Sequence, residues 1–421
     1  METTENAMFV ENATQVINGS NSSSHFLTTT ASESPVAVGR YSRPPGLISR
    51  EVAGDVTEAV YCYILPVLVV LGTLGNVMSL VVLWAEKKRD TTNMSLAALA
   101  VSDTGYILTT FARQTSCIIS KFDPVWARNY TTLMYGQMIV VNICFSRITG
   151  VITAIISTER CLAVVLPLKV RDLVTNSRIA IALVLTYVLT FALIGPVFAS
   201  GESLWVTNPR TNRTYVTYRT TQWYNENKEF ADNYRDIFLN TMFRFLPVVL
   251  VCCNTIAIIV RLKKASAWRG DSSSQAGQAR AAKERKLTTM LLTICGIYLF
   301  CTLPGLVFQV FTYITDEFSV FGRYAAMYTM TTSLSILAQF INSSVNFLVY
   351  MAMNDRFAKT YVKVFCCKKC LSSTIEKGGA AKTKELKTAS TKLTSAGGVS
   401  STADGSSVSK DADPAQVKVK A

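Results

Sequence analysis

Apolar residues gather along the chain in seven long runs that polar segments separate. The runs cover roughly residues 59–84, 94–116, 131–158, 179–200, 237–260, 287–315 and 324–353. Each is long enough to supply the ~20 residues that a helix needs to cross the hydrocarbon core of a bilayer. Backbone polar groups must be hydrogen-bonded inside lipid, and a helix satisfies them within one segment. The pattern therefore predicts an all-α membrane protein, a seven-transmembrane helix bundle.

Polar tails flank this region, and a short amphipathic segment follows it. We expect residues 1–57 to be a disordered tail, residues 58–353 to be the seven-helix domain and residues 371–421 to be a flexible tail rich in Ser, Thr, Lys, Gly and Ala. Residues 354–370 alternate aromatic and basic positions, which predicts an eighth, amphipathic helix on the membrane surface. Its cysteines are either palmitoylated or plain free thiols: Cys366, Cys367 and Cys370.

Composition supports a membrane protein, and the charge pattern gives it a direction. The chain is 49% hydrophobic and 17% charged, with a mean hydropathy of +0.28. Its net charge of +14 concentrates in the links after the first, third and fifth runs and beyond the seventh. Cytoplasmic links carry excess Lys and Arg, so we expect a multi-pass plasma-membrane protein with its N-terminus extracellular. Because these links account for the positive charge, nucleic-acid binding is not expected.

Four Asn-x-Ser/Thr triplets agree with this direction. The predicted glycosylation sites all lie on the side that the charge pattern places outside: Asn12, Asn18, Asn21 and Asn212. Among the other triplets, those at Asn93 and Asn342 fall in a cytoplasmic link and inside a run, so we do not expect these two to be modified.

Short motifs recur at matching places within the runs. They are "GNVMSLVVL" from Gly75, "LAVSD" ending at Asp103, "ERCLAVVLPL" from Glu159, "YLFCTLP" ending at Pro304 and "NSSVNFLVY" ending at Tyr350. Together and in this order they resemble the rhodopsin-like (class A) G-protein-coupled receptors over about residues 59–366. The stretch "STERCLAVVLPLKV" most resembles the chemosensory-type and FMRFamide-like peptide receptors of molluscs and related invertebrates.

The resemblance implies an activation switch at the cytoplasmic end of the bundle. Arg160 would be held at rest by Glu159 and by Glu284, and freed when the sixth helix swings outward. Taken alone, the Glu159–Arg160 pair reads equally as an interfacial ion pair. The switch would comprise Glu159, Arg160, Glu284, Pro304, Asn346 and Tyr350.

Asp103 is the one acid deep in the second run, and an acid at that depth is a functional candidate. The resemblance implies a sodium ion or a polar network there, formed with Asn76, Thr149 and Asn342, and Asn346 is a further candidate oxygen donor nearby. A protonated, hydrogen-bonded Asp103 is the alternative. No cofactor is expected apart from that sodium ion.

Several positions depart from the family pattern. Phe347 replaces a proline of the seventh helix, and Thr302 replaces a tryptophan of the sixth. Tyr135 stands where the family has the cysteine that bridges to the second outer loop, and residues 201–236 contain no cysteine, so that bridge cannot form. Cys62 and Cys117 lie near the outer ends of their helices, where they either pair instead or remain two free buried thiols.

The predicted ligand pocket is cationic. Asn142 stands where amine receptors carry an acid, and residues 324–353 contain no lysine to bind retinal. Arg147 and Arg244 lie at pocket depth, and the outer halves of their helices contain no acid. We expect them to bind an anionic group of the ligand, with bonding to backbone carbonyls and water as the alternative. The candidate ligand-binding residues are Asn142, Arg147, Arg244, Gln309 and Gln339.

These features predict a receptor that converts binding of an extracellular peptide or small-molecule ligand into activation of a heterotrimeric G protein. We expect the ligand to be a neuropeptide or a small anionic chemosensory molecule. Arrestin and a receptor kinase would act on the tail, and membrane lipid would surround the helices. A transporter or channel is the alternative, although no internal repeat is visible. An enzyme is not expected, because the single histidine, His25, lies in the outer tail.

Overall fold

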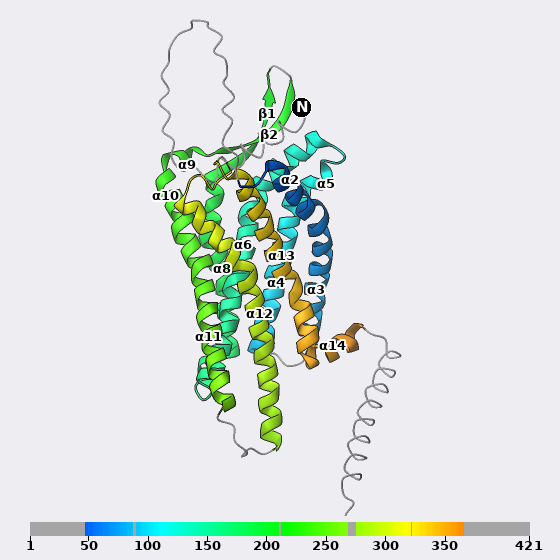
Figure 1. The fold of residues 1–421 in the computed structure, drawn as a ribbon, viewed down its shortest axis with the longest axis vertical. Helices are drawn as coiled ribbons and strands as arrows, with labels where there is room; N and C mark the ends of the chain where they lie inside the picture. The colour runs from blue at the N-terminus through cyan, green and yellow to red at the C-terminus, as the bar shows by residue number, and fades with distance from the viewer. Residues whose placement is uncertain (1–46, 87–89, 210–211, 268–274, 321, 366–421) are drawn as a thin grey trace, which may run out of the picture. The chain divides into compact units, whose positions relative to one another are not determined.

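The computed structural model describes residues 47–86, 90–209, 212–267, 275–320 and 322–365 (Figure 1). The first half of the described chain contains α2 (Arg50–Glu58), η1 (Ala59–Ile64), α3 (Leu65–Ala85), α4 (Thr91–Gln114), α5 (Ser116–Ile119), α6 (Pro124–Val165), α7 (Val170–Leu173), α8 (Asn176–Ile194) and η2 (Gly195–Ser200). The second half contains β1 (Gly201–Asn208), β2 (Arg213–Thr220), α9 (Gln222–Glu226), α10 (Lys228–Asp232), η3 (Asn233–Leu239), η4 (Thr241–Phe245), α11 (Leu246–Ala267), α12 (Gln275–Ile314), α13 (Ala325–Met353) and α14 (Asp355–Phe365).

Six helical segments of the described chain are long and apolar enough to cross a membrane. They are Arg50–Ala85, Pro124–Val165, Asn176–Ser200, Lys228–Lys264, Glu284–Ile314 and Ala325–Met353. The other long helix, α4, has 24 residues and is therefore about 36 Å long, also enough to span. It is more polar because Ser95, Ser102 and Asp103 are fully buried against its neighbours α3, α6, α8 and α13. The predicted bundle of seven helices is thus confirmed.

The first helix starts earlier than the sequence predicted. The hydroxyl of Ser49 accepts a hydrogen bond of 3.2 Å from the backbone of Val52, which is a typical N-cap. Residues 50–57, which the sequence placed in a disordered tail, are therefore helical and continue into the membrane span. The hydropathy boundary missed them because α2 is amphipathic and buries only Ala53 fully.

Two π-helical turns lie beside prolines. Segment η1 ends at Ile64, two residues before Pro66, and η4 ends at Phe245, two residues before Pro247. A proline donates no backbone hydrogen bond, and its ring crowds the carbonyl of the preceding turn. The wider turn relieves this crowding. In η4 it also sets the direction of Arg244, which belongs to the candidate site below.

A β-hairpin that the sequence did not predict occupies the second loop of one end of the bundle, called here the hairpin end (Figure 1). Its strands pair antiparallel, with Gly201 opposite Thr220. The backbone of Val216 donates to Asn129 Oδ1 at 3.0 Å, and Ser203 Oγ donates to the Thr132 carbonyl at 3.2 Å. These bonds attach the hairpin to α6 where the family bridge is missing.

Tyr135, the residue at the position of the missing cysteine, adds an aromatic contact to this attachment. Its ring meets that of Tyr218 on β2 edge to face, with 5.6 Å between centroids. Gly136 lets the hairpin approach closely, because a Cβ at this position would overlap the hydroxyl of Ser203. Hydrogen bonds and ring packing therefore hold the hairpin to α6 in place of the absent disulfide.

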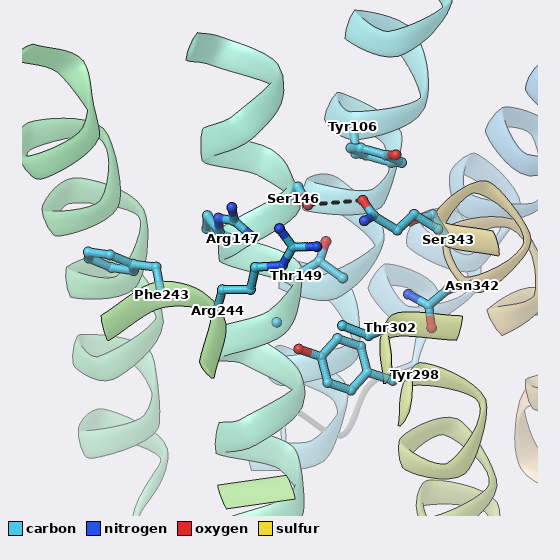
Figure 2. Close-up of a pocket in the computed structure, with 12 residues that line it drawn as sticks. Tyr106, Ser146, Arg147, Thr149, Phe243, Arg244, Tyr298, Thr302, Asn342 and Ser343 are labelled. Atoms are coloured by element: carbon cyan, nitrogen blue, oxygen red, sulfur yellow. Dashed lines mark hydrogen bonds between the residues drawn. The ribbon is translucent and has the colours of Figure 1, made fainter. Parts of the chain in front are cut away.

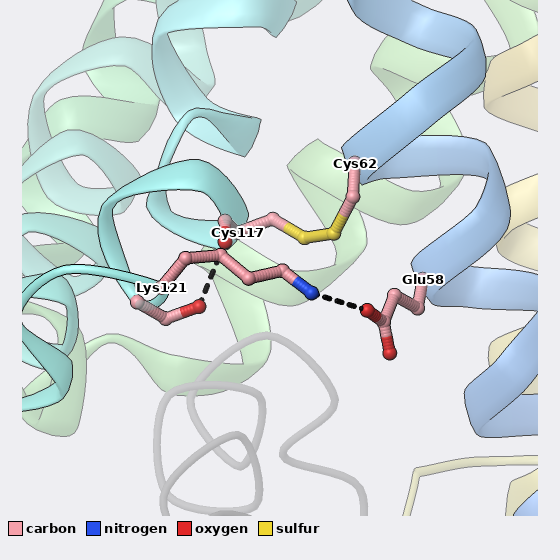
Figure 3. The surroundings of a disulfide bond; sticks show 5 residues. Glu58, Cys62, Cys117 and Lys121 are labelled. Carbon is pink, nitrogen blue, oxygen red and sulfur yellow. Dashed lines mark hydrogen bonds and ion pairs between the residues drawn. A yellow bond between two sulfur atoms is a disulfide. The ribbon is translucent and has the colours of Figure 1, made fainter.

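The structure pairs Cys62 with Cys117, which settles the choice left open by the sequence (Figure 3). Their Cα atoms are 5.6 Å apart, and the bond joins η1 to α5 at the hairpin end. Beside it, Lys121 Nζ lies 2.7 Å from Glu58 Oε1, and this hydrogen bond raises the pKa of Lys121. The first helix is thus held to the turn that follows α4.

The eighth helix, α14, lies at the opposite end of the bundle, the α14 end (Figure 1). Phe357 is fully buried, with its ring centroid 5.5 Å from that of Tyr350 and 6.1 Å from that of Phe347. Part of the face that was expected to contact lipid therefore packs on α13, while Val364 remains exposed. Phe347, which replaces the family proline, fills this junction, and α13 runs without a break from Ala325 to Met353.

We expect loss of the Cys62–Cys117 bond to destabilise the protein. The bond closes a loop of 55 residues, so its removal should lower the melting temperature of the purified full-length chain by roughly 5 °C or more. Cys62→Ser, Cys117→Ser and the double variant should show the same loss, measured by thiol-reactive dye fluorescence. Cys253→Ser, which changes an exposed free cysteine, is the control. An unchanged melting temperature in the double variant would contradict a stabilising bond.

Candidate functional site

A cavity lies in the middle of the bundle, where five helical segments converge (Figure 2). Its lining includes Tyr106 of α4, Ser146 and Arg147 of α6, Arg244 of η4, Thr302 of α12 and Gln339 of α13. Thr302, which replaces the family tryptophan, leaves room at this point of α12. Gly150 allows Tyr298 to approach α6, because a Cβ at Gly150 would lie 2.8 Å from the Tyr298 hydroxyl.

The two predicted arginines both extend into this cavity (Figure 2). Arg147 Nη2 donates to Asn240 Oδ1 at 3.1 Å, and Arg244 Nη1 donates to Gln309 Oε1. The hydroxyl of Tyr313 accepts from Asn240 Nδ2 and from Gln309 Nε2, each at 3.0 Å. One hydroxyl therefore orients both amides so that their oxygens face the arginines.

The two guanidinium groups of this cavity have no direct acidic partner among the described residues. None of the described residues that line it is acidic, and the side chains that accept from Arg147 and Arg244 are neutral amides. A buried cation without a counter-ion costs free energy in a membrane-spanning bundle. The two guanidinium groups therefore present donors that no carboxylate of the described lining satisfies.

The predicted glutamines take two different places. Gln339 lines the cavity and accepts a hydrogen bond of 3.2 Å from Ser146 Oγ, drawn as a dashed line in Figure 2. Gln309 supports Arg244 from outside the lining. Asn142 differs from the prediction: it faces α4, and its amide donates to Thr110 Oγ1 at 2.6 Å. It therefore does not line this cavity.

Asp103 binds three donors next to the cavity. Its carboxylate accepts from Thr149 Oγ1 at 3.0 Å, from Ser343 Oγ at 2.9 Å and from Asn346 Nδ2 at 2.7 Å. All four residues are buried. Asn346, predicted both as part of the switch and as an oxygen donor near Asp103, contacts Asp103 through its amide nitrogen. Ser343 was missed, although it lies three residues before Asn346 and so shares its helix face.

The two other predicted members of the Asp103 network lie beside it. Asn76 donates to the backbone carbonyl of Ser343 at 2.9 Å and so joins α3 to α13. Asn342 lines the cavity. The carboxylate oxygens of Asp103 and the hydroxyls of Thr149 and Ser343 form an all-oxygen set, which suits a hard cation such as sodium. The residues present therefore fit the ion that the resemblance implied, with Asn346 as a donor to the carboxylate.

At the α14 end, Arg160 contacts residues of α4 and its own neighbour. Arg160 Nη2 lies 2.5 Å from Glu159 Oε1 and also donates to Thr92 Oγ1. Glu159 is buried, and it also accepts from Thr91 Oγ1 at 2.5 Å. Glu284, the other predicted partner of Arg160, is exposed on α12.

A different ion pair joins α12, the sixth membrane helix, to α14. Lys286 Nζ lies 2.7 Å from Asp355 Oδ2, and this hydrogen bond holds the pKa of Asp355 below its ordinary value. Tyr350 is buried beside Phe357, and Pro304 lies inside α12. The structure thus separates the predicted switch residues into an Arg160 group, the Asp103 group, the body of α12 and the contact of Tyr350 with α14.

The predicted modification sites fall in different parts of the chain. Asn212 is exposed in the hairpin turn, with φ of 49°. The remaining glycosylation and palmitoylation sites lie outside the described residues: Asn12, Asn18, Asn21, Cys366, Cys367 and Cys370.

Comparison with known proteins gives a consistent result. The family model described as 7 transmembrane receptor (rhodopsin family) matches residues 75–350. The human histamine H2 receptor is 26% identical over 311 residues, 72% of this chain and 79% of that receptor. The Drosophila melanogaster FMRFamide receptor is 24% identical over 70% of this chain and 52% of its own length. The mouse somatostatin receptor type 2 is 23% identical over 74% and 78%, respectively.

The oxygen set around Asp103 leads to a prediction about sodium. We expect the melting temperature of the purified full-length chain to rise by a few degrees in sodium chloride relative to choline chloride of equal ionic strength, because an ion that binds only the folded state stabilises it. Asp103→Asn should abolish this difference, and Asp355→Asn, which changes an exposed acid, should preserve it. Equal melting temperatures of the unaltered chain in the two salts would show that the network binds no sodium.

Proposed function

Since this chain belongs to the rhodopsin family of seven-transmembrane receptors, we propose that it is a G-protein-coupled receptor whose extracellular ligand carries an anionic group bound between Arg147 and Arg244. The family match covers residues 75–350, most of the helix bundle, so receptor function is shown at that level and a transporter or channel is not favoured. Members of this family are not enzymes. The nature of the ligand is the part that we propose.

The observation that carries the proposal is the pair of arginines in one cavity that contains no acid among its described lining residues. Arginine presents a planar set of N–H donors that matches carboxylate, sulfate or phosphate oxygens. A ligand anion would replace the neutral amides of Asn240 and Gln309 as partner and compensate both charges. The binding free energy would thus come from compensating two buried positive charges.

The same geometry disfavours a cationic amine. The residue at the family position of the amine-binding acid is Asn142, and it contacts α4 rather than the cavity. A protonated amine in the cavity would meet two guanidinium groups and no carboxylate among the described lining residues. The similarity to a histamine receptor therefore supports the fold and the receptor class, and we do not extend it to the ligand.

The proposal places the hairpin end outside the cell and the α14 end in the cytoplasm. Two features support this direction: the exposed triplet at Asn212 lies in the hairpin, and the basic links lie toward α14. The G protein would then bind beside Arg160, and arrestin and a receptor kinase would act on residues 371–421. The invertebrate chemosensory or peptide subtype belongs to this proposal as well.

Ligand binding would act on the contacts between the fifth membrane helix, which contains η3, η4 and α11, and the sixth, which is α12. The hydroxyl of Tyr313 on α12 binds Asn240, which precedes η4, and also donates to the carbonyl of Asp236 in η3 at 3.2 Å. A ligand that draws Arg147 and Arg244 to itself frees the amides that meet at Tyr313. It thereby changes the relative stability of two helix arrangements, which is how a receptor transmits binding.

Substitution of the arginines tests the ligand class. In cells that express the receptor, we expect Arg147→Gln and Arg244→Gln each to reduce the potency of an activating carboxylic or sulfated compound by roughly 10- to 100-fold, the loss of one charge-assisted hydrogen bond. Calcium and cyclic-AMP responses give the readout across small acids, sulfated metabolites and amidated peptides. Arg219→Gln, on the exposed hairpin, is the matched control.

Activation by neutral amidated peptides that neither substitution affects would reject the anionic ligand. The receptor would then be a peptide receptor in which both arginines have a structural role. Surface expression must be equal among the variants, so that altered potency reflects binding rather than the amount of receptor.

Basal signalling tests which acid restrains Arg160. Glu159 is buried and contacts Arg160, whereas Glu284 is exposed. We therefore expect Glu159→Gln to raise ligand-free signalling several-fold, because it leaves Arg160 without its counter-charge, and Glu284→Gln to raise it less. Binding of a GTP analogue in membranes provides the measurement. A larger effect of Glu284→Gln would instead support the lock to the sixth helix that the resemblance implied.

A further inference from the structure

We propose that Arg113 and Tyr135 form a second anion-binding subsite, so that the ligand of this receptor carries two anionic groups rather than one. The inference rests on the proposed function, because the first anionic group is the one bound between Arg147 and Arg244. It deepens that function by assigning a second contact and a narrower ligand class. The subsite is referred to below as the Arg113 subsite.

Arg113 is a third inward-facing arginine without an acidic partner. It lies in the last turn of α4, where Nη1 donates to Asn142 Oδ1 at 3.2 Å. Its guanidinium carbon lies 5.8 Å from the ring centroid of Tyr135, a cation–π contact. Its Nε is buried and has no hydrogen-bond partner among the described residues. The charge is thus held by neutral groups, and one of its donors is left unused.

Tyr135 supplies a second unused donor at the same place. Its hydroxyl is buried and likewise has no hydrogen-bond partner in the described part of the chain. The ring lines a second cavity, between α6 and the hairpin, together with Tyr218 and Gly201. Arg235 also lines this cavity, but Asp232 and Asp236 neutralise it. Two adjoining residues therefore each hold a buried donor that only an added acceptor would satisfy.

Asn142 acts as a positioning residue for this subsite. Its Nδ2 donates to Thr110 Oγ1 at 2.6 Å and to Thr109 Oγ1 at 3.0 Å. These two bonds fix the amide so that Oδ1 faces Arg113. Asn142, which was expected to contact the ligand, instead positions Arg113, and Arg113 would make that contact.

The Arg113 subsite lies between the hairpin end and the first cavity. Tyr106, which lines that cavity, is two helical turns from Arg113 on the same face of α4. On α6, Asn142 precedes Arg147 by five residues, or about 7.5 Å along the axis. These spacings put the two subsites within the length of one extended molecule that carries an acidic group at each end. A ligand of this class is a long-chain dicarboxylate or a peptide with two separated acidic groups.

A matched pair of acids tests this inference. The full-length receptor in lipid nanodiscs is titrated with suberate, a linear dicarboxylate, and with octanoate, the monocarboxylate of equal chain length, and the melting temperature is followed. We expect suberate to bind the unaltered receptor roughly tenfold more tightly than octanoate, because it gains a charge-assisted contact. Arg113→Gln should reduce the affinity for suberate to that for octanoate and leave the affinity for octanoate unchanged. Tyr135→Phe should also lower the affinity for suberate, but by a smaller factor.

The variants separate failure of this inference from failure of the proposed function. The double variant Arg147→Gln/Arg244→Gln should lower the affinity for both acids, and Arg219→Gln should lower neither affinity. If Arg113→Gln preserves the preference for suberate while the double variant loses both acids, the Arg113 subsite is wrong and the first subsite remains. If the double variant binds both acids normally, or if neither acid stabilises the unaltered receptor, both proposals are overturned. Should Arg113→Gln fail to fold, Tyr135→Phe and Arg113→Lys decide, since the lysine keeps the charge but loses the planar donor set.

Discussion

The centre of the bundle depends on a single buried carboxylate. Asp103 stands on α4 and binds Thr149 of α6 together with Ser343 and Asn346 of α13. Because this group cannot face lipid, α4 must lie inside the bundle, and its other polar residues can then be buried as well. Removing one partner would leave a buried polar group unsatisfied, so the helices around Asp103 are fixed relative to one another.

Much of the fold was readable from the sequence, because hydropathy reports which segments face lipid. The seven spans and the amphipathic eighth helix followed from hydropathy. The predicted start of the first helix was wrong, because the amphipathic helix α2 precedes the apolar run and is continuous with it. The hairpin was also missed. A signal for it existed in "RTYVTYRT" (213–220), which is rich in β-branched and aromatic residues and follows Asn208, Pro209 and Asn212, residue types that are common in turns.

The candidate site was only partly readable, because sequence shows the depth of a residue but not which neighbour it faces. Arg147 and Arg244 were found from depth and the lack of nearby acids, and both line the cavity. Asn142 was placed at the right depth but faces α4. Arg113 stands close to the end of an apolar run, where charge is ordinary, and only the structure shows that it turns inward to Asn142.

The attachment of the hairpin has a thermodynamic consequence. Hydrogen bonds to Asn129 and Thr132 and the ring contact between Tyr135 and Tyr218 hold it, and none of these is covalent. Detaching this loop would therefore cost only the free energy of these noncovalent contacts, whereas a disulfide-bridged loop stays attached until the bond is reduced. The cover of the second cavity, which the hairpin lines, thus depends on contacts that temperature and denaturant weaken.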